Sequence, residues 1–343
     1  MIQDIFSGYI PLIDAEMRQI LGDDQADLAA HYGMLRYHMG WVDEQFQTVR
    51  SDGGKRIRPV LCLLACQAVG GTVDQALPAA ASLELLHNFS LIHDDIEDDS
   101  PTRRHRPTVW AIWGRPQAIN AGDAMFSVSR VALSGLAERG LPAEVVLDAT
   151  RVFDESCLRL TEGQFLDMSF EDRLDVTSEQ YLRMIGGKTA ALLGASLRIG
   201  AIVGGARMPV QDSLADYGYQ LGLAFQIRDD LLGIWGDERQ TGKSAQSDIL
   251  ARKKSLPVVY ALQHFDVGEA LSALYSQPIF PDDVQAVMAL LDQCGARVYA
   301  EDMAASAHRA ALDALQASGV LEAENGVGQA LLQISRALLD RQK

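Results

Sequence analysis

Five carboxylates follow one apolar run in the first third of the chain. Residues 83–92 are largely apolar, and the acids after them are Asp94, Asp95, Glu97, Asp98 and Asp99. The apolar run predicts a buried helix, which Pro101 should end near Ser100. Asp94 and Asp98 are four residues apart, so their carboxylates would share one helix face and repel each other. A bound Mg²⁺ would offset this repulsion, because that ion takes one or two carboxylates together with water and phosphate. A solvated helix end is the alternative interpretation.

Basic residues lie on both sides of this acidic segment. They are Lys55, Arg56 and Arg58 before it, and Arg103, Arg104 and Arg106 after it. Lys55 and Arg58 are three residues apart, after two glycines and before a helix predicted at residues 60–69. Both could therefore face one anion near a helix start, where the helix dipole favours negative charge. A simple basic turn would explain the same residues.

A second acidic cluster ends another apolar run, at residues 221–227. Its acids are Asp229 and Asp230, and the lysines Lys243 and Lys253 follow. Two such clusters, each at the end of an apolar helix and each followed by cations, predict metal sites on opposite walls of a cavity. The cations would complete a phosphate cage there.

Polar candidates also occur between the two clusters. Gln164 and Asp167 lie three residues apart in a mostly apolar helix, either as satisfied core groups or as ligand contacts. Lys188 and Thr189 follow two glycines, without the spacing of a P-loop. A phosphate-facing lysine beside a helix kink fits this segment.

Composition limits the classes of function. The chain has 343 residues and a formal net charge of −16, with 48% hydrophobic and 22% charged residues. A chain this acidic is a poor candidate for binding nucleic acid or an anionic membrane surface. We expect no membrane span and no signal peptide, because no apolar segment is long enough and the start lacks a basic region. The cysteines, Cys62, Cys66, Cys157 and Cys294, are interpreted as free thiols of a cytoplasmic protein.

The elements that would position these residues are helices. Helical patterns are expected at residues 1–50, 60–69, 109–113, 118–136 and 143–160, and strand signals are nearly absent. Gly70-Gly71 and Pro78 are expected to form a turn before the acid-bearing helix. The prediction is an all-α fold. Because no linker or boundary is found, residues 1–343 are expected to form a single domain.

Taken in order, these motifs resemble those of the trans-type polyprenyl diphosphate synthases. The resemblance covers residues 45–320 and rests on Gly54-Lys55-x-x-Arg58, Asp94-Asp95-x-x-Asp98 with Arg103-Arg104, Gly187-Lys188-Thr189, Phe225-Gln226-x-x-Asp229-Asp230, Thr241-Gly-Lys243 and Lys253. It implies the isoprenoid synthase fold, an all-α bundle around a central apolar cavity, in a homodimer. It also implies condensation of isopentenyl diphosphate with an allylic prenyl diphosphate, with Mg²⁺ as the cofactor and three ions per active site.

The resemblance implies a role for each matched residue. The metal ligands would be Asp94, Asp95, Asp98, Asp229 and Asp230. Isopentenyl diphosphate would contact Lys55, Arg58, His87 and Arg104. The allylic diphosphate would contact Arg103, Lys188, Thr189, Gln226, Lys243 and Lys253. The catalytic set would be Asp94, Asp98, Arg103, Lys188, Asp229 and Lys243. These groups would stabilise the negative charge that grows on the leaving diphosphate.

Product length is expected to depend on the residues before Asp94. Ser90, four positions earlier, is small and should let a C15 tail grow past it, whereas Phe89 is large enough to limit longer tails. This pattern resembles that of geranylgeranyl diphosphate synthases, which form a C20 product. A farnesyl diphosphate synthase is the alternative, and ordinary core packing is the alternative explanation for Phe89.

Two positions depart from the family pattern. Gly233 occupies the place of the usual third acid in the second motif, so Asp237 or Asp248 would have to support the third metal. His105 occupies the place of a glycine after the paired arginines, which should affect the loop more than the chemistry.

Two other functions are compatible with the same fold, one catalytic and one non-catalytic. A class I terpene cyclase would lack an isopentenyl diphosphate site, and Lys55, Arg58 and Arg104 argue against it. A non-catalytic partner subunit would have lost acids of the first motif, and this chain keeps them.

Overall fold

The computed structural model describes residues 2–22, 26–49, 53–236, 246–323 and 326–339 of the chain. These residues divide into two compact units, which are described separately. Unit 1 comprises Met1–Phe153, Ser196–Gln211 and Ala323–Ala330. Unit 2 comprises Asp154–Ala195, Asp212–Glu322 and Leu331–Lys343. The single domain expected for residues 1–343 stays a prediction.

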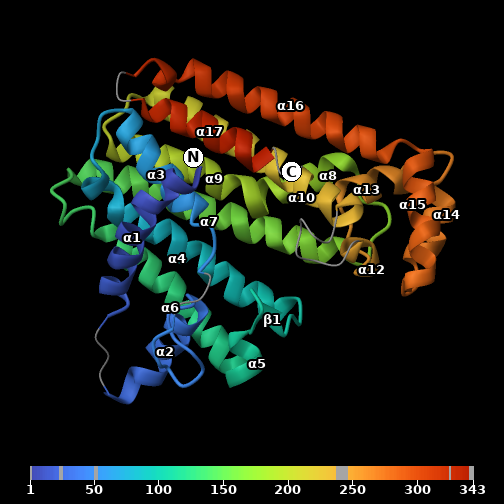
Figure 1. Cartoon of the computed structure of the whole chain (residues 1–343), viewed down its shortest axis with the longest axis horizontal. Helices are drawn as coiled ribbons and strands as arrows, with labels where there is room; N and C mark the ends of the chain where they lie inside the picture. The colour runs from blue at the N-terminus through green and yellow to red at the C-terminus, as the bar shows by residue number, and fades with distance from the viewer. Residues whose placement is uncertain (1, 23–25, 50–52, 237–245, 324–325, 340–343) are drawn as a thin grey trace. The chain divides into compact units, whose positions relative to one another are not determined.

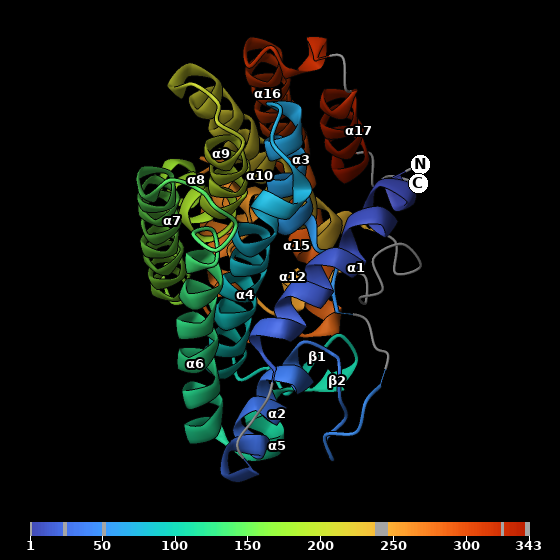
Figure 2. The same cartoon turned by 90° about the vertical axis from the view of Figure 1, so that its left-hand side faces the viewer.

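Unit 1 is helical apart from one short strand pair among its described residues. Its elements are α1 (Ile2–Ile20), η1 (Ala26–Leu28), α2 (Ala29–His38), α3 (Ile57–Ala68), α4 (Val73–Glu97), β1 (Thr102–Arg103), β2 (Arg106–Pro107), α5 (Val109–Trp113) and α6 (Arg115–Ser134). Within this unit α4 packs along α6 and against α3 and α1 (Figures 1 and 2). α4 is therefore the helix on which the others of this unit are assembled.

Four helices contribute residues to both units: α7 (Ala143–Phe170), α9 (Ala191–Val203), α10 (Met208–Trp235) and α17 (Val327–Leu339). The other elements of unit 2 are α8 (Ser178–Ile185), the π-helix η2 (Gly186–Ala190), α12 (Ser247–Leu250), α13 (Leu256–Leu262), α14 (Gly268–Tyr275), η3 (Pro281–Asp283), α15 (Val284–Gln293), α16 (Ala296–Ala317) and η4 (Val320–Glu322). The all-α prediction is confirmed. The expected helices at 60–69, 109–113, 118–136 and 143–160 correspond to α3, α5, α6 and α7. The pattern over residues 1–50 is helical only as far as α2.

α4 begins with a capping box that the sequence analysis did not identify. The Thr72 hydroxyl accepts a hydrogen bond from the Gln75 backbone N–H, and Gln75 Oε1 accepts one from the Thr72 backbone N–H. The prediction of a turn at Pro78 was wrong, because Pro78 lies inside α4. The capping box at Thr72 starts the helix before the proline. Pro78 therefore lies inside the helix, where its missing N–H removes one intrahelical hydrogen bond near the N-terminus. The apolar run of residues 83–92 is buried as predicted, with Leu83 and Leu86 fully inaccessible.

The end of α4 leads into the hairpin formed by β1 and β2. The helix ends at Glu97, and the Ser100 backbone N–H still bonds to the Asp95 carbonyl at 3.0 Å, close to the predicted end. Arg104 and His105 form the two-residue turn and have φ values of 51° and 60°. Positive φ at both positions is the type I′ combination that favours glycine and asparagine. The usual glycine of the motif is thus replaced here by a histidine in a left-handed conformation.

Two apolar clusters form the core of unit 2. One gathers residues of α12, α13, α14 and α15, including the buried Ile249, Leu271 and Tyr275. The other holds α8, α10, α13 and α16 together through residues such as Tyr181 and Ile227. The second cluster fixes the end of α10 that carries Asp229 and Asp230. None of the helices in the described part of the chain is long and apolar enough to cross a membrane.

We expect His105→Gly to stabilise the protein. A left-handed non-glycine residue costs about 1–2 kcal/mol, and the greater freedom of glycine in the unfolded chain offsets part of the gain. The expected net increase in the free energy of unfolding is about 0.5–1 kcal/mol, measured by urea denaturation. His105→Ala is the control, because it keeps the unfavourable φ. Equal stability of the two variants would contradict the explanation.

Candidate active site

The acidic end of α4 has the geometry that the spacing predicts. The Asp98 backbone N–H bonds to the Asp94 carbonyl at 2.9 Å, so these residues lie one helical turn apart. Asp94 is half-buried and Asp98 is exposed. Their carboxylate oxygens are the hard donors that Mg²⁺ prefers. No group of three or more acids, histidines or cysteines in the described residues encloses a metal site. The donors therefore fit an ion that completes its coordination with water and phosphate, and the metal assignments stay predictions.

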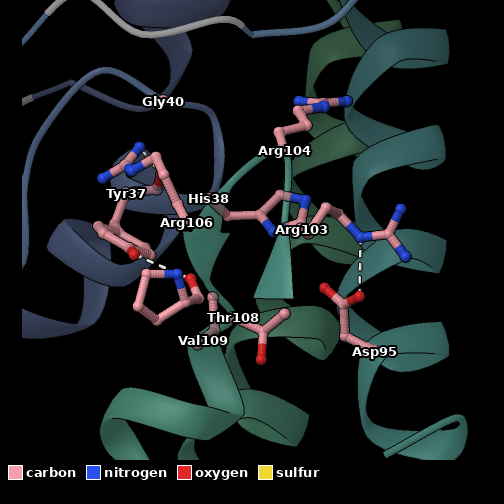
Figure 3. Close-up of a pocket in the computed structure, with 10 residues that line it drawn as sticks. Tyr37, His38, Gly40, Asp95, Arg103, Arg104, Arg106, Thr108 and Val109 are labelled. Carbon is pink, nitrogen blue, oxygen red and sulfur yellow. Dashed lines mark hydrogen bonds and ion pairs between the residues drawn. The ribbon is translucent and has the colours of Figure 1, made fainter. Parts of the chain in front are cut away.

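Asp95 points to another face of α4 and is buried. Its Oδ1 accepts a hydrogen bond from Arg103 Nε at 2.7 Å (Figure 3), while the buried Oδ2 has no partner among the residues that the structure describes. Burial raises the pKa of Asp95 to about 6, although the Arg103 guanidinium opposes this shift. The carboxylate thus orients Arg103, one of the cations expected at the allylic diphosphate.

A small pocket lies between this ion pair and the hairpin, lined by His38, Arg104 and Arg106 among others (Figure 3). Arg106 stacks on the Tyr37 ring, 4.0 Å from its centroid, and donates to the Val42 carbonyl at 2.7 Å. Arg106 of the hairpin therefore binds the segment around Val42, which follows α2. His38 was not identified from the sequence, since nothing near it in the chain marks it.

Three of the predicted diphosphate-binding arginines act on His87. Burial lowers the pKa of His87 well below its usual value, and the charges of Arg58, Arg104 and Arg103 lower it further. His87 is therefore neutral at pH 7. Arg58 Nε is buried and has no hydrogen-bond partner in the described part of the chain, and burial also lowers the pKa of this guanidinium. Unit 1 thus gathers positive charge around one neutral histidine, while Lys55 lies exposed in the loop before α3.

A continuous set of polar contacts crosses the predicted site residues of unit 2. Thr189 Oγ1 donates to Gln226 Oε1 at 3.0 Å, and Gln226 Nε2 donates to Asp230 Oδ1 at 3.3 Å. Lys253 Nζ lies 3.7 Å from Asp230 Oδ1 and 3.4 Å from Asp248 Oδ2. Burial alone would lower the pKa of Lys253, but these carboxylates outweigh it and raise the pKa. Unit 2 therefore brings together Thr189, Gln226, Asp230 and Lys253.

Asp230 is completely buried, and both of its carboxylate oxygens accept hydrogen bonds. Oδ2 accepts from the Tyr181 hydroxyl and from the Leu256 backbone N–H, in addition to the contacts of Oδ1. Burial raises the pKa of Asp230, and Lys253 opposes the shift. Asp229 next to it is only half-buried. Asp229 is thus more accessible to a ligand than Asp230.

Lys188 lies in the π-helix η2. Its Nζ is 2.5 Å from Asp167 Oδ2, so Asp167 of α7 positions the lysine. The backbones of α7 and η2 approach closely at this point. A Cβ on Gly163 would lie 2.1 Å from the backbone nitrogen of Lys188. The expected helix kink is therefore a π-bulge. Because Gly163 of α7 has no side chain, the backbone of this π-bulge can contact α7 directly. Lys243, like Thr241 and Asp237, lies outside the described residues.

Asp248 fills the space left by Gly233. A Cβ on Gly233 would lie 2.2 Å from Asp248 Oδ2 and 2.4 Å from its Cγ. A carboxylate is therefore present next to the position where the usual third acid is missing. Whether it supports a metal stays a prediction.

The two predicted chain-length residues differ in their surroundings. Ser90 is 8% exposed and donates to the His87 carbonyl at 2.8 Å, so its small side chain turns back on its own helix. Phe89 packs against Phe126 of α6 and His93, with ring centroids 5.3 Å and 5.2 Å away. Phe89 thus lies at the contact between α4 and α6.

A family profile described as polyprenyl synthetase matches residues 39–291. The chain belongs to the polyprenyl synthetase family. It is a prenyltransferase of the polyprenyl diphosphate synthase type, with the all-α isoprenoid synthase fold. Enzymes of this family use isopentenyl diphosphate and an allylic diphosphate as substrates.

Relatives of this family member carry different product names. A short chain isoprenyl diphosphate synthase of Methanothermobacter thermautotrophicus is 40% identical and covers 99% of each chain. In Mycobacterium tuberculosis, a (2E,6E)-farnesyl diphosphate synthase is 43% identical over 78% of this chain and 75% of its own. A geranylgeranyl diphosphate synthase from that organism is 42% identical over 82% and 80%. A crystal structure of polyprenyl synthetase from Streptomyces coelicolor has a TM-score of 0.90, with 36% identity over 99% of this chain and 100% of that chain.

The raised pKa of Asp95 predicts a pH dependence of stability in the metal-free protein. Between pH 4 and 6 the folded state binds a proton that the unfolded state has released, so stability falls as pH rises through this range. Relative to Asp95→Asn, the wild type should gain up to about 3 kcal/mol as pH falls from 7 to 4. Urea denaturation in chelator measures this difference. Parallel pH profiles of the two proteins would contradict it.

Gly233→Asp should impair the enzyme rather than restore a family motif. The new side chain would meet the Asp248 carboxylate, so turnover should fall on the order of tenfold. The double variant Gly233→Asp/Asp248→Gly moves the carboxylate without the clash and should recover much of the loss. Gly233→Ala separates the steric effect from the charge. Wild-type turnover of Gly233→Asp would show that Asp248 does not fill this place.

Proposed function

We propose that the chain condenses isopentenyl diphosphate with an allylic diphosphate to form an all-trans, short-chain product, geranylgeranyl diphosphate. The observation that carries the substrate assignment is the gathering of Arg58, Arg103 and Arg104 around a neutral His87. Such a cluster attracts a polyanion and holds it by charge-assisted hydrogen bonds. The buried Nε of Arg58, which has no partner within the residues that the structure describes, supports this, since a buried donor needs an acceptor.

The predicted metal donors are Asp94, Asp98 and Asp229, with three Mg²⁺ ions per active site. Bound Mg²⁺ would supply positive charge for the leaving diphosphate. Asp95 and Asp230 are also predicted ligands. Their existing contacts with Arg103 and Lys253 favour a positioning role for them.

The protein's own groups would bind, orient and protect the substrates. Isopentenyl diphosphate would contact Lys55, Arg58, His87 and Arg104. The allylic diphosphate would contact Arg103, Lys188 and Lys243, which Thr189, Gln226 and Lys253 support. After the allylic C–O bond ionises, the homoallylic double bond attacks the cation, and the departing diphosphate takes the released proton. Apolar walls would exclude water from the cation.

The C20 product is supported by the small side chain at Ser90. A tail that grows along α4 must pass this position, one turn before Asp94, and serine leaves room for it. The relatives do not decide between C15 and C20, because both product names occur among them. The position of Phe89 against Phe126 supports a floor formed where α4 meets α6.

We also propose a homodimer in the cytoplasm. Exposed apolar side chains recur along α6, at Ile119 and Val131, and along α7, at Leu158, Phe165 and Met168. Phe165 is 69% exposed, and the exposed apolar side chains within α7 favour a protein partner on this helix. All four cysteines lie among the described residues as free thiols, which suits a reducing compartment.

The test is product sizing by chromatography with isopentenyl diphosphate, Mg²⁺ and farnesyl diphosphate as the primer. The wild type should form C20, and Asp94→Ala should lose most turnover. Ser90→Phe should shorten the product toward C15, because closely packed interiors resist an inserted ring.

The control is Ser90→Ala, which should keep the C20 product. Formation of C20 by Ser90→Phe at the wild-type rate would remove the support for this product length. The absence of any condensation product from the wild type would overturn the proposed function itself.

A further inference from the structure

Arg56 lies between two predicted isopentenyl diphosphate ligands, yet its side chain turns into unit 1. The residue is 3% exposed and has a left-handed backbone, with φ 50° and ψ 35°. A left-handed non-glycine residue persists only where its surroundings hold it. Arg56 therefore has a different task from Lys55 and Arg58, its neighbours in the chain.

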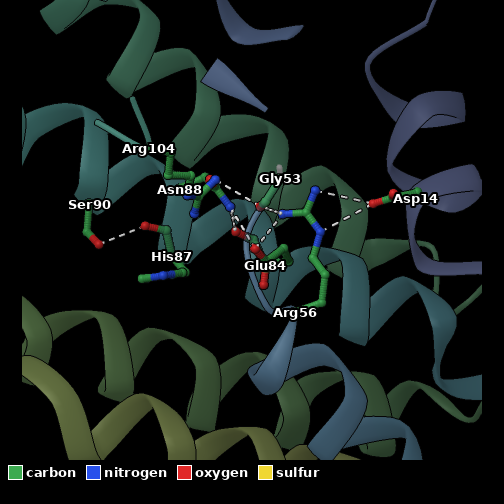
Figure 4. Close-up of polar contacts among 8 residues, drawn as sticks. All are labelled: Asp14, Gly53, Arg56, Glu84, His87, Asn88, Ser90 and Arg104. Carbon is green, nitrogen blue, oxygen red and sulfur yellow. Dashed lines mark hydrogen bonds and ion pairs between the residues drawn. The ribbon is translucent and has the colours of Figure 1, made fainter. Parts of the chain in front are cut away.

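The Arg56 guanidinium joins three segments of unit 1 (Figure 4). Nη1 donates to the Gly53 carbonyl at 2.7 Å and to Glu84 Oε1 of α4 at 2.8 Å. Nε donates to Asp14 Oδ1 of α1 at 3.3 Å. Glu84 is 2% exposed and also accepts from Asn88 Nδ2 at 2.9 Å. With two carboxylates of the protein as partners, Arg56 is not available to bind a diphosphate.

The same Gly53 carbonyl accepts a second arginine. Arg104 Nη1 donates to it at 2.8 Å, from the hairpin turn (Figure 4). The loop glycines make room for both guanidiniums. A Cβ on Gly53 would lie 2.7 Å from Arg56 Nη2, and a Cβ on Gly54 would lie 2.6 Å from Arg104 Nη2. Arg56 and Arg104 thus hold one loop from two sides.

We propose that Arg56 is a positioning residue for the isopentenyl diphosphate site, acting through the Gly53 carbonyl on Arg104 and on the adjoining Lys55. This inference rests on the proposed function. Anchored by Glu84 and Asp14, Arg56 fixes the carbonyl to which Arg104 is bound. The positions of two cations therefore depend on a third that does not touch the substrate.

The kinetic test is Arg56→Lys, because an ammonium cannot reproduce the fork of contacts to Gly53 and Glu84. The KM for isopentenyl diphosphate should rise about tenfold, as for a lost charge-assisted contact, while the KM for farnesyl diphosphate stays within about twofold. In an Arg104→Lys background, Arg56→Lys should add little, since both act through one carbonyl. Equal changes in both KM values, or fully additive effects, would indicate a merely structural role and overturn the proposal.

The matched control is Arg139→Lys. Arg139 likewise joins α1 and α4, by ion pairs with Glu16 at 2.8 Å and with Asp74. It makes no contact with the loop or the hairpin in these pairs. Arg139→Lys should leave both KM values unchanged. If Arg56→Lys fails to fold, Gly53→Ala disturbs the same contact by displacing the Arg56 guanidinium, and Gly8→Ala, which meets nothing within 4 Å, is its control.

Equilibrium binding separates this inference from the proposed function. Isopentenyl diphosphate is titrated into the protein by calorimetry in the presence of a chelator. Without metal, the allylic site should not bind the diphosphate and should not contribute to the signal. Arg56→Lys should bind about tenfold more weakly than the wild type. This difference without any turnover would leave the inference standing and refute the proposed function. Equal affinities, or no binding by the wild type, would overturn the inference regardless of turnover.

Discussion

A cation can bind a diphosphate only through donors that the protein's own carboxylates and carbonyls leave unused. This constraint is severe in a chain with 46 acidic and 30 basic residues. The structure meets it by dividing the cations of the site into two classes. Arg56 and Lys253 are held by carboxylates and keep walls and loops in place. Arg58 differs, because its buried Nε has no hydrogen-bond partner among the described residues.

The helices could be predicted from the sequence, and so could the spacing of the acids in the first motif, while the roles of the site residues stay predictions. The apolar run before Asp94 and the i, i+4 spacing to Asp98 depend on local geometry, and both are found in α4. Pro78 shows where local rules fail. A proline near a helix start resembles a turn signal, but the cap at Thr72 and burial of the helix outweigh the lost hydrogen bond.

The partners of the charged residues could not be predicted. Arg56 meets Glu84, 28 residues away, and Tyr181 meets Asp230, 49 residues away. Such pairs are set by how helices pack, and the spacing of residues along one helix does not contain that information. The same limit applies to His38, which lines the pocket beside Arg104. The sequence therefore supplies candidate charged residues for the site, but not which of them neutralise one another.

In both acidic motifs the two adjacent aspartates differ in burial and in their partners, and helix geometry explains the difference. Adjacent residues project about 100° apart around a helix, so two neighbouring aspartates cannot present their carboxylates to the same side. In α4 the second acid of the pair, Asp95, is buried and bound to Arg103. In α10 the second acid, Asp230, is buried and lies beside Lys253.

In each motif the first acid, Asp94 or Asp229, is the more accessible one. A buried carboxylate without a cation would be costly, so each second acid requires its partner. Each pairing in turn fixes a cation of the predicted diphosphate site. The paired aspartates are therefore best explained as one acid that stays accessible to a ligand and one that orders the cation beside it.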